Sequence, residues 1–86
     1  MRFRLSRHAR EELVSRRIPA EMLDAVLDRP EQVVAEQGGL RAYQSKFEFG
    51  RGKMFLVRAI VAEEADPPVV VTVYRTSKIA KYWRTP

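Results

Sequence analysis

The sequence predicts an α+β fold in which two N-terminal helices pack on a four-stranded antiparallel sheet, followed by a short C-terminal helical turn. Two observations lead to this prediction. Apolar residues recur at helical spacing in the first third of the chain and alternate at strand spacing afterwards. Turn residues of hairpin length separate the later segments, which favours antiparallel neighbours. With 86 residues, we expect a single domain with a thin core.

The first helix is predicted to begin at Ser6 and to run to about Arg17. Ser6 can cap the free amides of the first turn, and an apolar stripe at four-residue spacing follows it: Leu5, Ala9 and Leu13. Proline suits the first position of a helix, so Ile18-Pro19 indicates that a second helix begins there. This helix should end at Asp28-Arg29-Pro30, because a residue before proline avoids the helical conformation.

Four strands are predicted from alternation, at residues 32–36, 40–49, 53–62 and 69–75. The third has a wholly apolar phase that we assign to the core: Phe55, Val57, Ala59 and Val61. The fourth is the most apolar, so we place it centrally and expect Val71 and Val73 to face the helices. Ser77 can cap a last helical turn from Lys78 to Trp83.

The composition excludes several classes of site. The chain has no cysteine, which excludes disulfides and thiolate chemistry and fits a cytoplasmic protein. No apolar run approaches the roughly 20 residues of a membrane span, and no signal peptide is recognisable, so we expect no membrane partner. Neither a histidine–carboxylate cluster with the spacing of metal ligands nor a glycine-rich phosphate loop is present, so we expect no metal and no cofactor.

The net charge of +5 is distributed in blocks along the sequence. Residues 1–17 carry six arginines and two glutamates, residues 18–37 are acidic, and residues 69–86 carry four basic residues and no acid. If the basic blocks share a face, that face attracts phosphate backbones. The alternative is that these arginines and lysines are merely solvated, and charge alone does not separate the two readings.

His8 is the only histidine of the chain and lies in the first turn of the first predicted helix. An imidazole titrates at about pH 6.5, which makes it a natural general acid or base near neutrality. Glu11 and Glu12 follow three and four residues later and could orient the ring. The alternative is that His8 covers the seam between helix and sheet.

Arg75 ends the last predicted strand in the phase of Val73, so we expect it at the rim of the sheet below the first helix. There it needs a partner, either an acid of the first helix or a bound phosphate, whose oxygens match the guanidinium fork. Arg58 and Tyr74 are expected on the other face, as site residues or as ordinary strand residues. The basic and aromatic residues of segment 78–84 suit single-stranded nucleic acid, or a helix docked on the protein.

Two motifs resemble a known family over nearly the whole chain. One is Ser6-Arg7-His8-Ala9 followed by Arg17-Ile18-Pro19, and the other is Thr72-Val73-Tyr74-Arg75-Thr76-Ser77-Lys78 with Lys81-Tyr82-Trp83. Together they resemble the small domains called domain of unknown function 4258. That family is similar to the RelE/ParE and BrnT-like toxins and to the wider barnase–colicin–RelE group, which are mostly metal-independent ribonucleases and often toxins of bacterial toxin–antitoxin pairs.

The resemblance implies RNA cleavage through attack of a ribose 2′-hydroxyl on the adjacent phosphate. It implies that His8 is the general acid or base and that Arg75 stabilises the negative charge that develops at the phosphorane-like centre. The remaining matched residues would bind substrate: Arg58, Tyr74, Thr76, Ser77 and Lys78. The implied partners are RNA, a cognate antitoxin protein and a second copy of the chain. The alternative is a non-catalytic module that binds RNA or protein.

Overall fold

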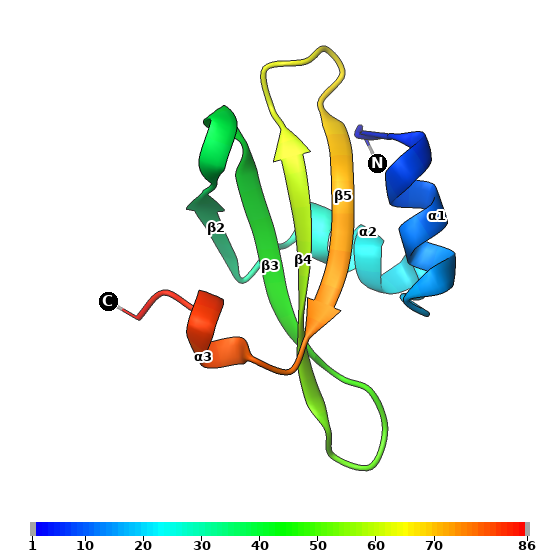
Figure 1. Ribbon diagram of the computed structural model, residues 1–86, viewed down its shortest axis with the longest axis vertical. Coiled ribbons are helices and arrows are strands. Elements are labelled where there is room, and N and C mark those ends of the chain that lie inside the picture. Colours follow the sequence, from blue (N-terminus) through cyan, green and yellow to red (C-terminus); the bar gives the residue numbers. More distant parts are fainter. Residues whose placement is uncertain (1, 86) are drawn as a thin grey trace.

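The computed structural model describes residues 2–85 and contains a five-stranded sheet with three helices around it (Figure 1). The elements are, in chain order, β1 (Arg4–Leu5), α1 (Arg7–Ser15), α2 (Ala20–Asp28), β2 (Gln32–Ala35), a 3₁₀ turn η1 (Gln37–Gly39), β3 (Arg41–Glu48), β4 (Met54–Ala62), β5 (Val69–Thr76) and α3 (Ile79–Tyr82). The strand order is β1-β5-β4-β3-β2. The predicted α+β class is therefore confirmed. The sheet, however, has a fifth strand and is mixed, because β1 runs parallel to β5.

The fifth strand was missed because it has only two residues and so no alternation to detect. Arg4 N–H donates to Pro68 O at 2.8 Å, and Ser6 N–H donates to Val70 O at 2.9 Å. This short pairing places the beginning of α1 beside β5. The side chain of Ser6 then caps α1 as predicted, since its Oγ accepts from Ala9 N–H at 3.0 Å.

The end of α1 forms a Schellman motif. Ile18 N–H donates to Leu13 O at 2.9 Å, and Arg17 N–H donates to Val14 O at 3.2 Å. Arg17 has a φ of 54°, in the left-handed region that favours glycine. An arginine at this position makes the fold less stable than a glycine would, because its Cβ is strained at this φ. The Arg17 side chain is exposed at the surface between α1 and α2.

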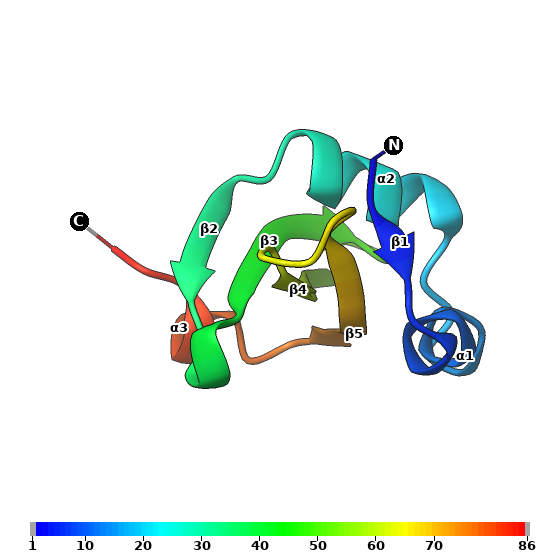
Figure 2. The same ribbon diagram turned by 90° about the horizontal axis from the view of Figure 1, so that it is seen from above.

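The core lies between the helices and one face of the sheet, and Figure 2 shows α2 above the sheet and α1 beside β1 and β5 at one edge. The predicted core phase of β4 is confirmed at Val57, Ala59 and Val61, which are buried, but Phe55 is only half-buried and lies outside the core. In β5 the prediction was wrong by one residue. Ile60 pairs with Thr72 but Val61 pairs with Val70, so Val71 is an extra residue, a β-bulge. Val70 and Val73, rather than Val71 and Val73, are buried in the core.

The central strand is β4 rather than the predicted β5. β1 covers only the first residues of the outer edge of β5, and α1 lies along the rest. Both phases of β4 are buried, because α3 packs against the second face of the sheet. The residue that precedes α3 is Lys78, without a side-chain cap, so the predicted cap by Ser77 is also wrong. Within residues 2–85, no helix is long and apolar enough to cross a membrane.

Candidate functional site at the α1–β5 edge

Glu12 joins α1 to β5 by accepting hydrogen bonds from the strand. Its side chain is buried, and its Oε1 accepts from Val73 N–H at 3.0 Å and from the hydroxyl of Thr72. β1 pairs with β5 only at Val69 and Val70, so the N–H of Val73 has no strand neighbour on that side. A buried N–H needs an acceptor, and the carboxylate of Glu12 supplies it.

The hydrogen bonds decide the ionisation state of Glu12. Burial by itself would raise the pKa of this carboxyl, but hydrogen bonds from Thr72, Val73 and Arg16, with the nearby imidazole of His8, together hold the pKa below its ordinary value of 4.5. Because the pKa is lower in the folded chain, ionised Glu12 stabilises the fold above the ordinary pKa. This contribution is lost as the pH falls through the lowered pKa.

His8 and Arg16 occupy the two oxygens of this carboxylate. His8 Nε2 lies 3.2 Å from Oε1, and Arg16 Nε lies 3.2 Å from Oε2. Because Nε2 faces the carboxylate, Nδ1 is the ring nitrogen left for other contacts. The His8 side chain is 64% exposed, which makes Nδ1 accessible to a ligand. Of the two acids that could orient the ring, Glu12 has this position, whereas Glu11 pairs with Arg7.

An arginine hollow lies at the other end of α1. We use this name for a depression of about 360 Å³ lined by Ser15, Arg16, Arg17, Phe55 and Arg75. The guanidinium of Arg75 lies over the rings of Phe49 and Phe55, with its Cζ 4.2 and 5.0 Å from their centroids. Within residues 2–85, neither Arg75 nor Arg17 forms a salt bridge. The hollow therefore presents positive charge that the chain does not neutralise.

The two predicted catalytic residues, His8 and Arg75, lie along the same helix but at different ends of it. His8 is in the first turn of α1, and Arg75 faces the last turn, about 12 Å further along the helix axis. Glu12 lies between them and brings His8 close to Arg16 instead. Of the arginines at this edge, Arg16 is thus the one that shares a carboxylate with the imidazole.

Arg58 lies in a buried network on the second face of the sheet. It is 2% exposed, and each of its nitrogens is engaged: Nε donates to Gln44 at 2.7 Å, Nη1 to Tyr74 at 2.6 Å and Nη2 to Glu36 at 3.1 Å. The ring of Tyr82 from α3 covers the guanidinium at 4.3 Å. The substrate-binding role of Arg58 and Tyr74 stays a prediction, and the structure gives both residues a structural use.

Tyr74 is held as a neutral phenol by this environment. Burial raises the pKa of Tyr74, and the hydrogen bond from Arg58 only partly opposes that rise. The three other predicted binding residues follow Arg75 where the chain crosses from β5 to α3. Thr76 Oγ1 accepts from Lys78 N–H at 3.0 Å, and Ser77 and Lys78 are exposed. Their roles also stay predictions.

Arg16 and Arg17 were not predicted as site residues. The signal for Arg16 is the spacing His8, Glu12, Arg16, which places three ionisable residues on one face of a helix. No such spacing marks Arg17, whose position depends on the end of the helix. Within residues 2–85, no cluster of three or more histidine and acidic side chains is placed to hold a metal ion.

The Arg58 network should contribute strongly to stability. We expect Arg58→Ala to lower the free energy of unfolding by about 3 to 5 kcal/mol, because it leaves Glu36 and Gln44 without their partner. Arg41→Ala is the matched control, since Arg41 is 48% exposed and pairs with Glu63, and it should cost less than about 1 kcal/mol. Urea denaturation followed by circular dichroism measures both, and equal losses would contradict the structural role.

The family was identified by comparison with known proteins. No curated protein and no solved structure matches the chain. A family model does match, over residues 5–75, and its description is domain of unknown function, DUF4258. The matched segment begins at Leu5 and ends at Arg75, so it contains α1, β5 except for its last residue, and the carboxylate that joins them. Because the match covers most of the 86 residues, the chain belongs to the DUF4258 family.

Proposed function

We propose that the α1–β5 edge binds single-stranded RNA and cleaves it without a metal ion, through attack of a ribose 2′-hydroxyl on the adjacent phosphate. One observation carries the proposal. An exposed imidazole is held by a buried carboxylate, on the same helix that lines the arginine hollow. A base with an orienting carboxylate, close to cations, is the arrangement that such a reaction needs. The likeness of the family to RelE/ParE and BrnT-like toxins supports it by analogy.

The proposed reaction uses few groups. His8 Nδ1 accepts the proton of the 2′-hydroxyl, and the 2′-oxygen then forms a bond to phosphorus. The bond from phosphorus to the 5′-oxygen breaks, and that oxygen takes a proton from water. The products are a 2′,3′-cyclic phosphate and a free 5′-hydroxyl. Arg16, on the other oxygen of Glu12, is placed to stabilise the charge on the phosphoryl oxygens.

Arg75 takes a different part in this proposal from the one expected. Its place at the last turn of α1 suits the next phosphate along the strand rather than the reacting one. Arg17 shares the same hollow and adds a second cation. In this proposal Arg58 and Tyr74 pack the second face of the sheet against α3, and only exposed residues contact the RNA.

RNA binding without cleavage is the second candidate function, and the arginine hollow favours it. Arg17 occupies a backbone position that glycine would fill with less strain, and its side chain lines this hollow beside Arg75. Cations at the surface that lack an acidic partner attract phosphates whether or not a reaction follows. In either case we propose RNA as the ligand, with an acidic antitoxin-type protein as the partner that the family likeness suggests.

Cleavage is tested with His8→Ala. In a chelator-containing buffer, the wild type should cut a labelled single-stranded RNA and leave cyclic phosphate ends, and the variant should be slower by about 100-fold or more. Added imidazole should restore part of the rate, because it replaces the missing base. Arg7→Ala is the matched control, since Arg7 is 93% exposed on the same helical turn and should leave the rate unchanged. Equal rates for wild type and His8→Ala would refute the catalytic role and leave binding alone.

Binding is tested with Arg17→Gly, which removes a cation and relaxes the backbone at once. We expect RNA affinity to fall by about three- to tenfold at low salt. The slope of log affinity against log salt concentration should also become shallower by about one, which corresponds to one lost phosphate contact. The melting temperature should stay the same or rise, because glycine favours a φ of 54°. Arg51→Gly is the matched control, as Arg51 has a φ of 52° in the β3–β4 turn. If both variants lose affinity equally, the hollow is not the RNA site.

A further inference from the structure

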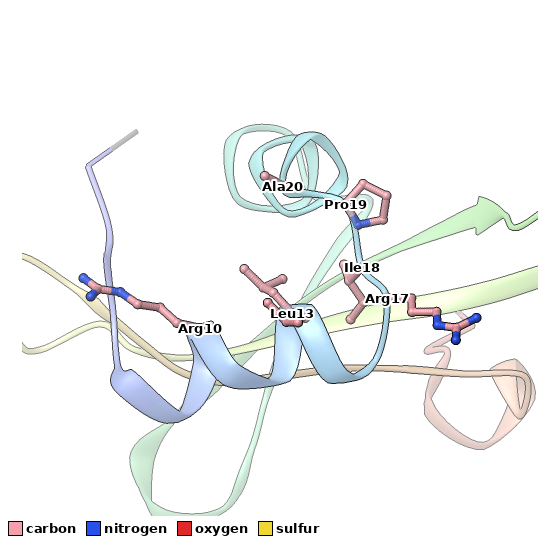
Figure 3. A pocket seen from close by; sticks show the side chains of 7 residues that line it. Arg10, Leu13, Arg17, Ile18, Pro19 and Ala20 are labelled. Atoms are coloured by element: carbon pink, nitrogen blue, oxygen red, sulfur yellow. The ribbon is translucent and has the colours of Figure 1, made fainter.

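An apolar groove lies between α1 and the beginning of α2 (Figure 3). We call it the interhelix groove; it has a volume of about 530 Å³ and is lined by Arg10, Leu13, Val14, Arg17, Ile18, Pro19 and Ala20. Val14 is 80% exposed there, and within residues 2–85 the other large exposed apolar side chain is Met54, at 45%. A single exposed apolar residue needs no explanation, but Val14 continues an apolar surface formed by Leu13 and Pro19.

The charges of the groove lie at its two ends. Figure 3 shows Arg10 and Arg17 extending in opposite directions from the apolar middle. No acid is among the lining residues, and neither arginine forms a salt bridge within the part of the chain that the structure describes. The two arginines are seven residues apart in sequence, Arg10 within α1 and Arg17 just beyond its end. An occupant should therefore be apolar in its middle and acidic at both ends.

We infer that the interhelix groove binds an amphipathic helix of another protein. Carboxylates near the two ends of that helix can each meet an arginine, because Arg10 and Arg17 lie at opposite ends of the groove. Apolar residues between them would cover Val14 and Leu13, as in other helix-in-groove complexes. The apolar middle and the cation at each end of the groove identify the partner by its chemistry.

A second copy of the chain fits this groove less well. Its α2 does carry acids seven residues apart, Glu21 and Asp28, and both are exposed. Between them the same exposed face presents Asp24, while Leu23, Val26 and Leu27 are buried in the core of their own chain. Without an apolar side chain in its middle, α2 cannot cover Val14.

The groove and the arginine hollow share Arg17. An acidic helix bound in the groove would pair with Arg17 and remove it from RNA. The partner would thus act as an inhibitor of RNA binding. This second step rests on the proposed function, whereas the binding of the helix does not.

A designed peptide tests the groove. The probe is a labelled helix of about 15 residues with leucines at three- and four-residue spacing and two glutamates seven apart, and a lysine-for-glutamate peptide is its control. Fluorescence anisotropy should show saturable binding of the acidic peptide. Val14→Asp should weaken it by about tenfold or more, and Arg10→Glu by several fold. Met54→Asp, at the other exposed apolar residue, should change nothing.

Three results would overturn the inference: no saturable binding, equal binding of the lysine peptide, or no effect of Val14→Asp. A dimer that forms without peptide and is lost in Val14→Asp would identify a second copy as the occupant and also overturn it.

A competition experiment between peptide and RNA then tests the sharing of Arg17. The peptide should displace RNA from the wild type but not from Val14→Asp. If peptide and RNA bind together, the sharing of Arg17 is refuted, and if RNA does not bind at all, the proposed function fails while the peptide result stands.

Discussion

The α1–β5 edge depends on one carboxylate, that of Glu12, which accepts a backbone hydrogen bond from β5 where no neighbouring strand is present. β1 is too short to pair with the middle of β5, so the N–H of Val73 would lack an acceptor without it. An ionised group is costly to bury, and here the hydrogen bonds from Thr72, Val73 and Arg16 offset that cost. The carboxylate that joins α1 to the sheet also accepts a hydrogen bond from Arg16 and contacts His8. Fold and candidate site are thus built on one interaction.

The arginines divide into two groups by the partners that the chain provides. Arg58 is buried, and every nitrogen of its guanidinium has an acceptor, so its charge serves the packing of α3 on the sheet. Arg17 and Arg75 lie around a hollow at the surface without an acidic partner in residues 2–85. A satisfied buried charge specifies structure, whereas an unpaired cation at the surface is available to a ligand. We therefore place function at the edge rather than on the second face.

Much of this was predictable from local patterns, and the errors have local causes. The cap by Ser6 and the core phase of β4 follow from short-range spacing, which the sequence displays directly. The bulge at Val71 lies in a run of three valines, where no alternation marks which one is extra. The burial of Arg58 depends on Glu36 and Gln44 of other strands and on Tyr82 of α3, a set of distant residues that no periodicity connects. His8 was identified because it is unique, whereas Arg16 was missed although its four-residue spacing from Glu12 is visible in the sequence.

The most direct test of this account is an NMR titration of the side-chain carboxyl of Glu12 in isotopically labelled protein. The account predicts a pKa for Glu12 below 4.5, with the amide proton of Val73 shifting at the same midpoint because it donates to that carboxylate. A pKa at or above 4.5, with a Val73 amide that does not respond, would contradict it. The helix would then lie against the sheet without the hydrogen bond from Val73 that holds Glu12 beside His8.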